Sequence, residues 1–126
     1  MKSAHDLVMA AKGHVQEVDI AQAQATIAAA QVLVDVREAD EFAAGHIPGA
    51  LHISRGMLEF KFAANPNLQD RNLRIVVYCK TSGRAALSAV ALQAMGYTQV
   101  QSIAGGFDAW TAAGLPVEKP AAPSFE

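Results

Sequence analysis

Short apolar runs alternate along the chain with longer segments of helix-forming residues. The apolar runs are rich in Val and Ile, and their length and composition predict buried strands over 32–36, 50–53, 75–78 and 100–103. The intervening segments are rich in helix formers and predict helices over 19–30, 37–44, 56–64, 84–95 and 105–110. Because strands and helices alternate, the pattern predicts an α/β domain with a mainly parallel sheet.

Polar residues and glycines mark the ends of these elements. Asp19 stands directly before the first predicted helix and is expected to act as its N-cap. Gly45 and Gly96 follow helices and are expected to end them. In the predicted helix 56–64, spacing places Met57, Phe60 and Ala64 on one apolar face.

No repeat or change of composition divides the chain. We therefore expect one domain over 1–126, with its core over about 15–118. Residues 1–13 are expected to be a flexible segment, either a loose extra helix or a contact with another subunit. The proline-containing tail over 119–126 is expected to be frayed.

Composition and charge narrow the classes of function. Of the 126 residues, 52% are hydrophobic and 17% are charged, which favours a folded core over disorder. A formal net charge of −2 gives no basic excess for nucleic acid or an anionic membrane. No apolar run is long enough to span a bilayer, and residues 1–9 lack the apolar segment of a secretory signal. We expect a cytoplasmic protein without a cofactor.

Cys79 is the single cysteine. A disulfide within the chain is impossible, and a metal site built on cysteines is close to excluded. A lone cysteine is most often a small core residue. Its neighbours therefore decide between that interpretation and a reactive thiol.

The neighbours of Cys79 favour a reactive thiol. It lies where a buried strand is predicted to end and a helix to begin. The N-terminus of a helix stabilises a thiolate through its unpaired backbone N–H groups and the positive end of the helix dipole. Lys80 and Arg84 add positive charges, and Gly83 permits a tight turn. The loop also contains two hydroxyl donors, Thr81 and Ser82. The pattern predicts a nucleophilic cysteine in an anion-binding loop.

None of the four histidines adjoins Cys79 in sequence; they are His5, His14, His46 and His52. A Cys-His hydrolase would need one of them brought close by the fold, and no local signature indicates this. His46 precedes a Pro-Gly turn and is expected to bond to backbone.

Three segments of the chain resemble the rhodanese family and occur in its order. They are Asp35-Val36-Arg37-Glu38 continuing through Glu41-Phe42 to 45–50, Tyr78-Cys79 with the loop to Arg84, and 105–110 followed by 113–117. Together they cover most of residues 15–118.

The resemblance implies a rhodanese-like α/β fold with a central five-stranded, mainly parallel sheet and helices on both faces. It implies that the loop from Cys79 to Arg84 holds a persulfide with its backbone N–H groups. Sulfane sulfur would pass from a small anionic donor such as thiosulfate to cyanide or a thiol, including a protein thiol. The loop lacks the Gly-rich sequence typical of mercaptopyruvate-specific relatives, which argues against that donor.

Other residues of the matching segments have expected roles outside the chemistry. Asp35 and Arg37 are expected to be architectural, because a short acidic residue at a strand end commonly binds backbone or an Arg. Arg55 is expected to be a solvated surface residue, with a place in the mouth of the site as the alternative. Trp110 is expected to anchor the last helix in the core.

Two other functions remain open from the sequence. A Cys-dependent phosphatase or arsenate reductase also uses a thiolate and an Arg around an anion, but with five residues between them and usually a His before the Cys. Here four residues separate Cys79 from Arg84, and Tyr78 precedes the Cys. A smaller ring suits a single sulfur better than a tetrahedral oxyanion. The second alternative is a non-catalytic or regulatory rhodanese-like binding module, a class that often lacks the cysteine.

Overall fold

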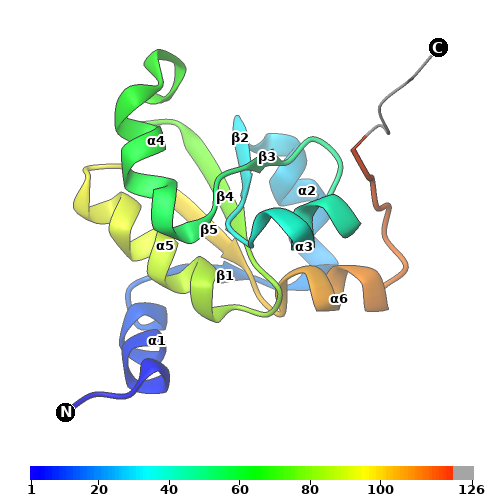
Figure 1. Ribbon diagram of the computed structural model, residues 1–126, viewed down its shortest axis with the longest axis horizontal. Helices are drawn as coiled ribbons and strands as arrows, with labels where there is room; N and C mark the ends of the chain where they lie inside the picture. Colours follow the sequence, from blue (N-terminus) through cyan, green and yellow to red (C-terminus); the bar gives the residue numbers. More distant parts are fainter. Residues whose placement is uncertain (121–126) are drawn as a thin grey trace.

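A computed structural model describes residues 1–120 of the chain, and its centre is a five-stranded sheet (Figure 1). The strands are β1 (Gln16–Val18), β2 (Val32–Asp35), β3 (Leu51–His52), β4 (Arg74–Tyr78) and β5 (Gln99–Ile103). They lie in the order β1-β5-β4-β2-β3, and every neighbouring pair is parallel. The predicted rhodanese-like α/β architecture is confirmed, with all of the described strand pairs parallel.

Helices precede, connect and follow the strands, and those from residue 20 onward lie where the sequence predicts helices. They are α1 (Ala4–Lys12), α2 (Ile20–Ala29), α3 (Ala39–Ala44), α4 (Leu58–Ala64), α5 (Gly83–Ala94) and α6 (Gly106–Ala112), with 3₁₀ turns η1 (Arg55–Met57) and η2 (Pro66–Leu68). Asp19 is the N-cap of α2, and its carboxylate accepts from the backbone N–H of Gln22 at 3.1 Å. This bond satisfies one of the helix's unpaired N–H groups, as predicted.

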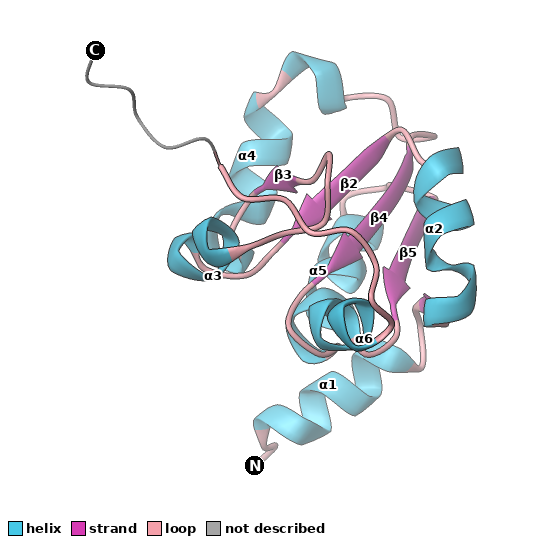
Figure 2. Ribbon diagram, turned by 90° about the vertical axis from the view of Figure 1, so that its right-hand side faces the viewer, coloured by secondary structure: helices cyan, strands magenta, loops and turns pink. Residues whose placement is uncertain are grey.

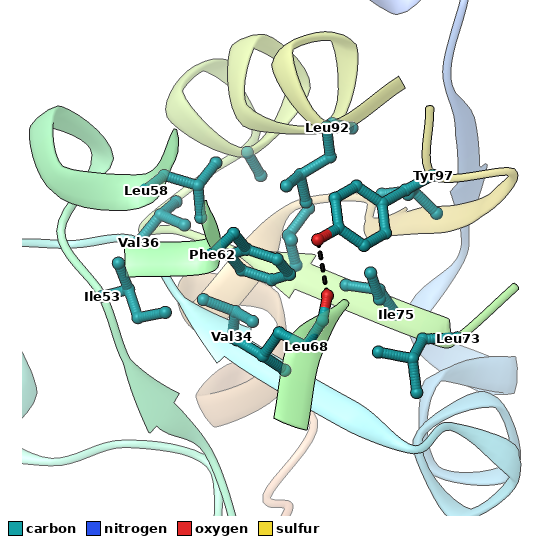
Figure 3. Packing of buried hydrophobic residues seen from close by; sticks show 14 of the residues in the cluster. Val34, Val36, Ile53, Leu58, Phe62, Leu68, Leu73, Ile75, Leu92 and Tyr97 are labelled. Carbon is teal, nitrogen blue, oxygen red and sulfur yellow. Dashed lines mark hydrogen bonds between the residues drawn. The ribbon is translucent and has the colours of Figure 1, made fainter. Parts of the chain in front are cut away.

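The two faces of the sheet are covered by different helices, which gives two apolar clusters (Figure 2). One face packs against α4 and α5, where Leu58, Phe62 and Leu92 are fully buried. Figure 3 shows this cluster, in which the rings of Phe62 and Tyr97 meet edge-on with centroids 5.4 Å apart. The Tyr97 hydroxyl donates to the carbonyl of Leu68, so its buried polar end is satisfied.

The second cluster lies under α2 and α6. It contains Trp110, which is buried and donates from Nε1 to the carbonyl of Pro116 at 2.6 Å. The predicted role of Trp110 as a core anchor is confirmed. The two clusters hold the strand ends in fixed positions, and the functional loops follow those ends.

Two local features differ from the sequence-based predictions. Strand β1 was not predicted, because it has three residues and Val18 is its single buried side chain. In α4 the buried face is formed by Leu58 and Phe62, whereas Met57 and Phe60 are exposed, so the predicted face is wrong. The preceding residues form a 3₁₀ turn, whose tighter winding shifts the phase of the helix that follows.

The N-terminal segment forms helix α1, and α1 packs against α5 (Figure 1). Ser3 caps α1 by accepting from the N–H of Asp6 at 3.0 Å. Val8 of α1 lies beside Gly83, the first residue of α5. A Cβ added to Gly83 would lie 3.3 Å from a Val8 methyl group. Most of the tail predicted to be frayed lies outside the described residues.

No helix among residues 1–120 has the length and apolar character needed to cross a membrane.

Candidate functional site

Cys79 follows β4 at the carboxyl edge of the sheet. Strand β2 lies on one side of β4 and β5 on the other, and the chain leaves β2 toward β3 before crossing back to β4. The neighbouring pair β2 and β4 is therefore the point at which the direction of chain winding reverses. Ligands of open α/β sheets bind beside strand ends at such points.

The sulfur of Cys79 is buried against the first turn of α5. The residue is 1% exposed and belongs to the apolar cluster under that helix. Its Sγ accepts a hydrogen bond from the backbone N–H of Ala85 at 3.3 Å. The sulfur thus lies at the positive end of a twelve-residue helix, as the sequence predicts.

The loop from Cys79 to Arg84 is held from outside by α6. The N–H of Phe107 donates to the carbonyl of Cys79 at 2.8 Å, and that of Asp108 donates to the carbonyl of Lys80 at 3.0 Å. Because a trans peptide places C=O and N–H on opposite sides, the N–H groups of these two peptide units point away from α6. Within residues 1–120, the backbone N–H groups over 80–84 have no hydrogen-bond acceptor.

Gly106 makes this contact between α6 and the loop possible. A Cβ at this position would lie 2.4 Å from the carbonyl oxygens of both Cys79 and Thr81. The residue also has φ +55°, a region that L side chains rarely adopt. The sequence marked Gly106 as the start of a helix but did not indicate that it lies against the cysteine loop.

The two basic residues of the loop each form an ion pair with a carboxylate. Lys80 Nζ lies 2.7 Å from Asp108 Oδ2, and both side chains are more than half exposed. Arg84 binds Glu41 with two hydrogen bonds, of 2.7 and 3.1 Å. Thr81 is exposed, and Ser82 and Gly83 are half-buried. The sequence placed two positive charges in this loop, and the structure adds a negative charge beside each.

Glu41 is fixed in position by a second contact. Its Oε1 accepts from the backbone N–H of Glu38 at 3.0 Å. The hydrogen bonds from Arg84 are the largest cause that lowers the pKa of Glu41 to about 2. Arg84 therefore favours the ionised form of Glu41.

Arg55 lies after β3 and pairs with Glu59 one helical turn later, at 2.9 Å. Its side chain is 29% exposed, so it is neither fully solvated nor buried. The backbone N–H of Arg55 donates to the carbonyl of Val36, which fixes the loop after β3 against the loop after β2. A place for Arg55 in the mouth of the site remains a prediction.

Asp35 and Arg37 form a buried scaffold beneath the site. Asp35 is fully buried and accepts from the backbone N–H of Arg37 at 2.9 Å and from its guanidinium at 2.7 to 3.1 Å. Arg37 also donates to the carbonyl of Gly45 at 2.7 Å and stacks on the Phe107 ring at 4.3 Å. These contacts tie the loop after β2 to α6, and the architectural role of the pair remains a prediction.

His46 and His52 bind backbone. His46 Nδ1 lies 3.1 Å from the carbonyl oxygen of Phe42, and its ring stacks on the Phe42 ring with centroids 3.8 Å apart. His52 Nε2 lies 2.8 Å from the carbonyl oxygen of Arg37. The expectation that His46 bonds to backbone is confirmed.

Comparison with known proteins identifies the same region of the chain. A family model described as the rhodanese-like domain matches residues 19–113. A thiosulfate sulfurtransferase GlpE of Pseudomonas savastanoi is 38% identical over 72% of this chain and 82% of its own length. A sulfurtransferase of Allochromatium vinosum is 33% identical over 71% of this chain and 79% of its own length.

Solved structures share the fold. A protein of unknown function from Rhodopseudomonas palustris, described as a possible tyrosine phosphatase, is 34% identical and superposes with a TM-score of 0.86 over 94% of this chain and 96% of its own. The human single-domain sulfurtransferase is 27% identical, with a TM-score of 0.70 over 78% of this chain and 96% of its own. With the family model matched from α2 to α6 and the fold shared over nearly the whole length of these proteins, the chain belongs to the rhodanese-like domain family.

Proposed function

We propose that this protein is a sulfurtransferase that moves sulfane sulfur from thiosulfate or a similar donor to cyanide or a thiol. The observation that carries the proposal is the position of the Cys79 sulfur. It accepts from the N–H of Ala85 and is followed by five backbone N–H groups without an acceptor in the described chain. Lys80 to Arg84 supply those groups and form the proposed substrate-binding loop.

The proposed reaction has two displacement steps. The Cys79 thiolate attacks the outer sulfur of thiosulfate, a new S–S bond forms, and the bond to the sulfonate sulfur breaks so that sulfite leaves with the electron pair. The acceptor then attacks the outer sulfur of the Cys79 persulfide. Cyanide becomes thiocyanate, and the Cys79 thiolate is regenerated.

The loop suits the charge of the intermediate. A Cys79 persulfide carries its negative charge on the outer sulfur, beyond the position of Sγ. Backbone N–H groups that are already oriented stabilise such a charge without reorganisation, as an oxyanion hole does. The hydrogen bonds from α6 to the carbonyls of Cys79 and Lys80 would keep the loop in this orientation.

Mass spectrometry of the intact protein after incubation with thiosulfate tests the proposal directly. We expect a gain of one sulfur atom, because the chain has a single thiol to carry it. Cyanide or dithiothreitol should remove the added mass and, with cyanide, release thiocyanate. A protein that stays at its original mass in millimolar thiosulfate would contradict the proposed reaction and favour a binding module.

Phosphatase activity is the second candidate, favoured by the description of the Rhodopseudomonas palustris relative. Four residues between Cys79 and Arg84 make a ring that we expect to accept one sulfur but not a phosphate. In addition, the Arg84 guanidinium already donates two hydrogen bonds to Glu41, and a phosphate would need those donors.

We therefore expect hydrolysis of an aryl phosphate by the wild-type protein to be no faster than by Cys79→Ser. Release of the phenol over hours at micromolar protein provides the measurement. Hydrolysis that depends on Cys79 would show that the short loop accepts a tetrahedral oxyanion.

A further inference from the structure

The two basic side chains of the cysteine loop, and Arg55 after β3, each pair with a carboxylate from a different helix. Asp108 of α6 faces Lys80, Glu41 of α3 faces Arg84, and Glu59 of α4 faces Arg55. These six residues contribute equal numbers of positive and negative charges. The site therefore has oriented N–H groups for an anion but no excess of positive side chains.

The two pairs nearest Cys79 are fixed by additional contacts. Asp108 is bound to Lys80 twice, through its carboxylate and through its backbone N–H to the Lys80 carbonyl. Glu41 is held by Arg84 and by the N–H of Glu38. Arg84 directly precedes Ala85, whose N–H binds the Cys79 sulfur, so the Arg84–Glu41 pair lies in the helix turn against the sulfur.

Sulfur donors differ in the charge that they bring to such a site. Thiosulfate is a dianion at neutral pH, whereas the persulfide of a small uncharged thiol carries at most one negative charge. A fixed charge acts on a ligand in proportion to the ligand's own charge. The electrostatic repulsion between each of these carboxylates and thiosulfate is thus at least twice the repulsion between the same carboxylate and a persulfide.

We propose that Asp108 and Glu41 are specificity-determining residues. They lower the rate of sulfur transfer from dianionic donors relative to persulfides of at most one negative charge. The inference rests on the proposed sulfur transfer through Cys79. It assigns the donor class, R–S–SH with a small or uncharged R group, and makes thiosulfate a usable but disfavoured donor.

The persulfide reaction balances without another reactant. The Cys79 thiolate attacks the outer sulfur of R–S–SH, the new Sγ–S bond forms, and the original S–S bond breaks. The electron pair leaves with R–S⁻, and the proton stays on the transferred sulfur. The negative charge moves from one thiolate to the other.

The experiment compares two donors with charge-removing variants. The donors are thiosulfate and the persulfide of 2-mercaptoethanol, and the variants are Asp108→Asn and Glu41→Gln. The measurement is the second-order rate constant for forming the Cys79 persulfide in a single turnover, at about 0.01 M and about 1 M salt, where screening lengths are about 30 and 3 Å. Asn and Gln keep an oxygen acceptor for the paired cation while removing the charge.

We expect each variant to react about three- to tenfold faster with thiosulfate at low salt, because removal of one nearby negative charge relieves a repulsion that acts on both charges of the dianion. With the persulfide donor, the rate constant should increase by at most the square root of that factor. At about 1 M salt the gain with thiosulfate should shrink toward none.

Asp70→Asn is the matched control. It removes the same charge before β4, at the opposite end of a strand about 17 Å long, and Asn can still accept from the N–H of Asn72. Its rate constants should equal those of the wild type with both donors.

Equal changes with both donors, or a slower reaction with thiosulfate in both variants, would overturn the proposal, since the carboxylates would then only position the cations. Failure of both donors to add sulfur to wild-type Cys79 is a different result and would overturn the proposed function itself.

Discussion

A Cys79→Ser protein is expected to fold like the wild type and to transfer no sulfur from thiosulfate to cyanide. Ser differs from Cys by one atom, and its hydroxyl oxygen is able to accept the hydrogen bond that Ala85 N–H gives to Sγ. A serine oxygen cannot carry sulfane sulfur through a persulfide. Loss of a nucleophile commonly lowers turnover by roughly 10⁴-fold or more, and we expect a loss of that order in thiocyanate formation.

The stability of this variant separates chemistry from folding. Cys79 is 1% exposed and packs in the cluster with Val77 and Ala89, so Ser places a hydroxyl in a largely apolar site. Because that hydroxyl has a partner, the free energy of unfolding should fall by about 1 to 2 kcal/mol, measured by urea denaturation. Thiocyanate formation by a folded Cys79→Ser protein at more than a few per cent of the wild-type rate would rule out Cys79 as the sulfur carrier.

The sequence predicts best the features that depend on neighbouring residues. Asp19 caps α2 three residues away, and Asp35 binds Arg37 two residues away. The placement of Cys79 between β4 and α5 follows from an apolar run that meets a run of helix formers. In each case the atoms that interact are brought together by local backbone geometry.

The charge balance of the site could not be predicted in this way. Lys80 and Asp108 are 28 residues apart, and Arg84 and Glu41 are 43 residues apart. Their pairing depends on where α3 and α6 lie against α5, which is a property of the assembled sheet and its helices. The sequence therefore indicated basic residues around the cysteine, whereas the fold places a carboxylate beside each.

The contact between α6 and the loop from Cys79 to Arg84 could not be predicted from the sequence either. A glycine at a helix start has several common explanations, and Gly105-Gly106 indicated the start of α6 and a segment that resembles the family, but no contact with the cysteine loop. The structure assigns Gly106 a more specific place, because the Cys79 and Thr81 carbonyl oxygens occupy the space that a side chain would need.

Gly106→Ala is accordingly expected to impair sulfur transfer severely while the sheet stays folded. The added methyl group would lie 2.4 Å from two backbone oxygens, neither of which is able to move without moving the loop. N–H donors at such a site must be placed within roughly 0.5 Å, and loss of one well-placed donor costs about a hundredfold in turnover. We expect a decrease of at least that size in kcat/KM for thiosulfate.

Gly114→Ala provides the matched control, because it separates the clash from the strain of a positive φ. Gly114 has φ +72°, close to the +55° of Gly106, but a Cβ built on Gly114 has no neighbour within 4 Å among the described residues. Both variants should lose about 1 to 2 kcal/mol of stability from the left-handed backbone. Of the two variants, Gly106→Ala alone should lose sulfur transfer. Because its loop is displaced, the rate at which iodoacetamide alkylates Cys79 should also differ from the wild-type rate. If both folded variants transferred sulfur within twofold of the wild type, the contact between α6 and the loop would not set the geometry of the N–H groups, and the stabilisation of the persulfide would have to come from the first turn of α5 alone.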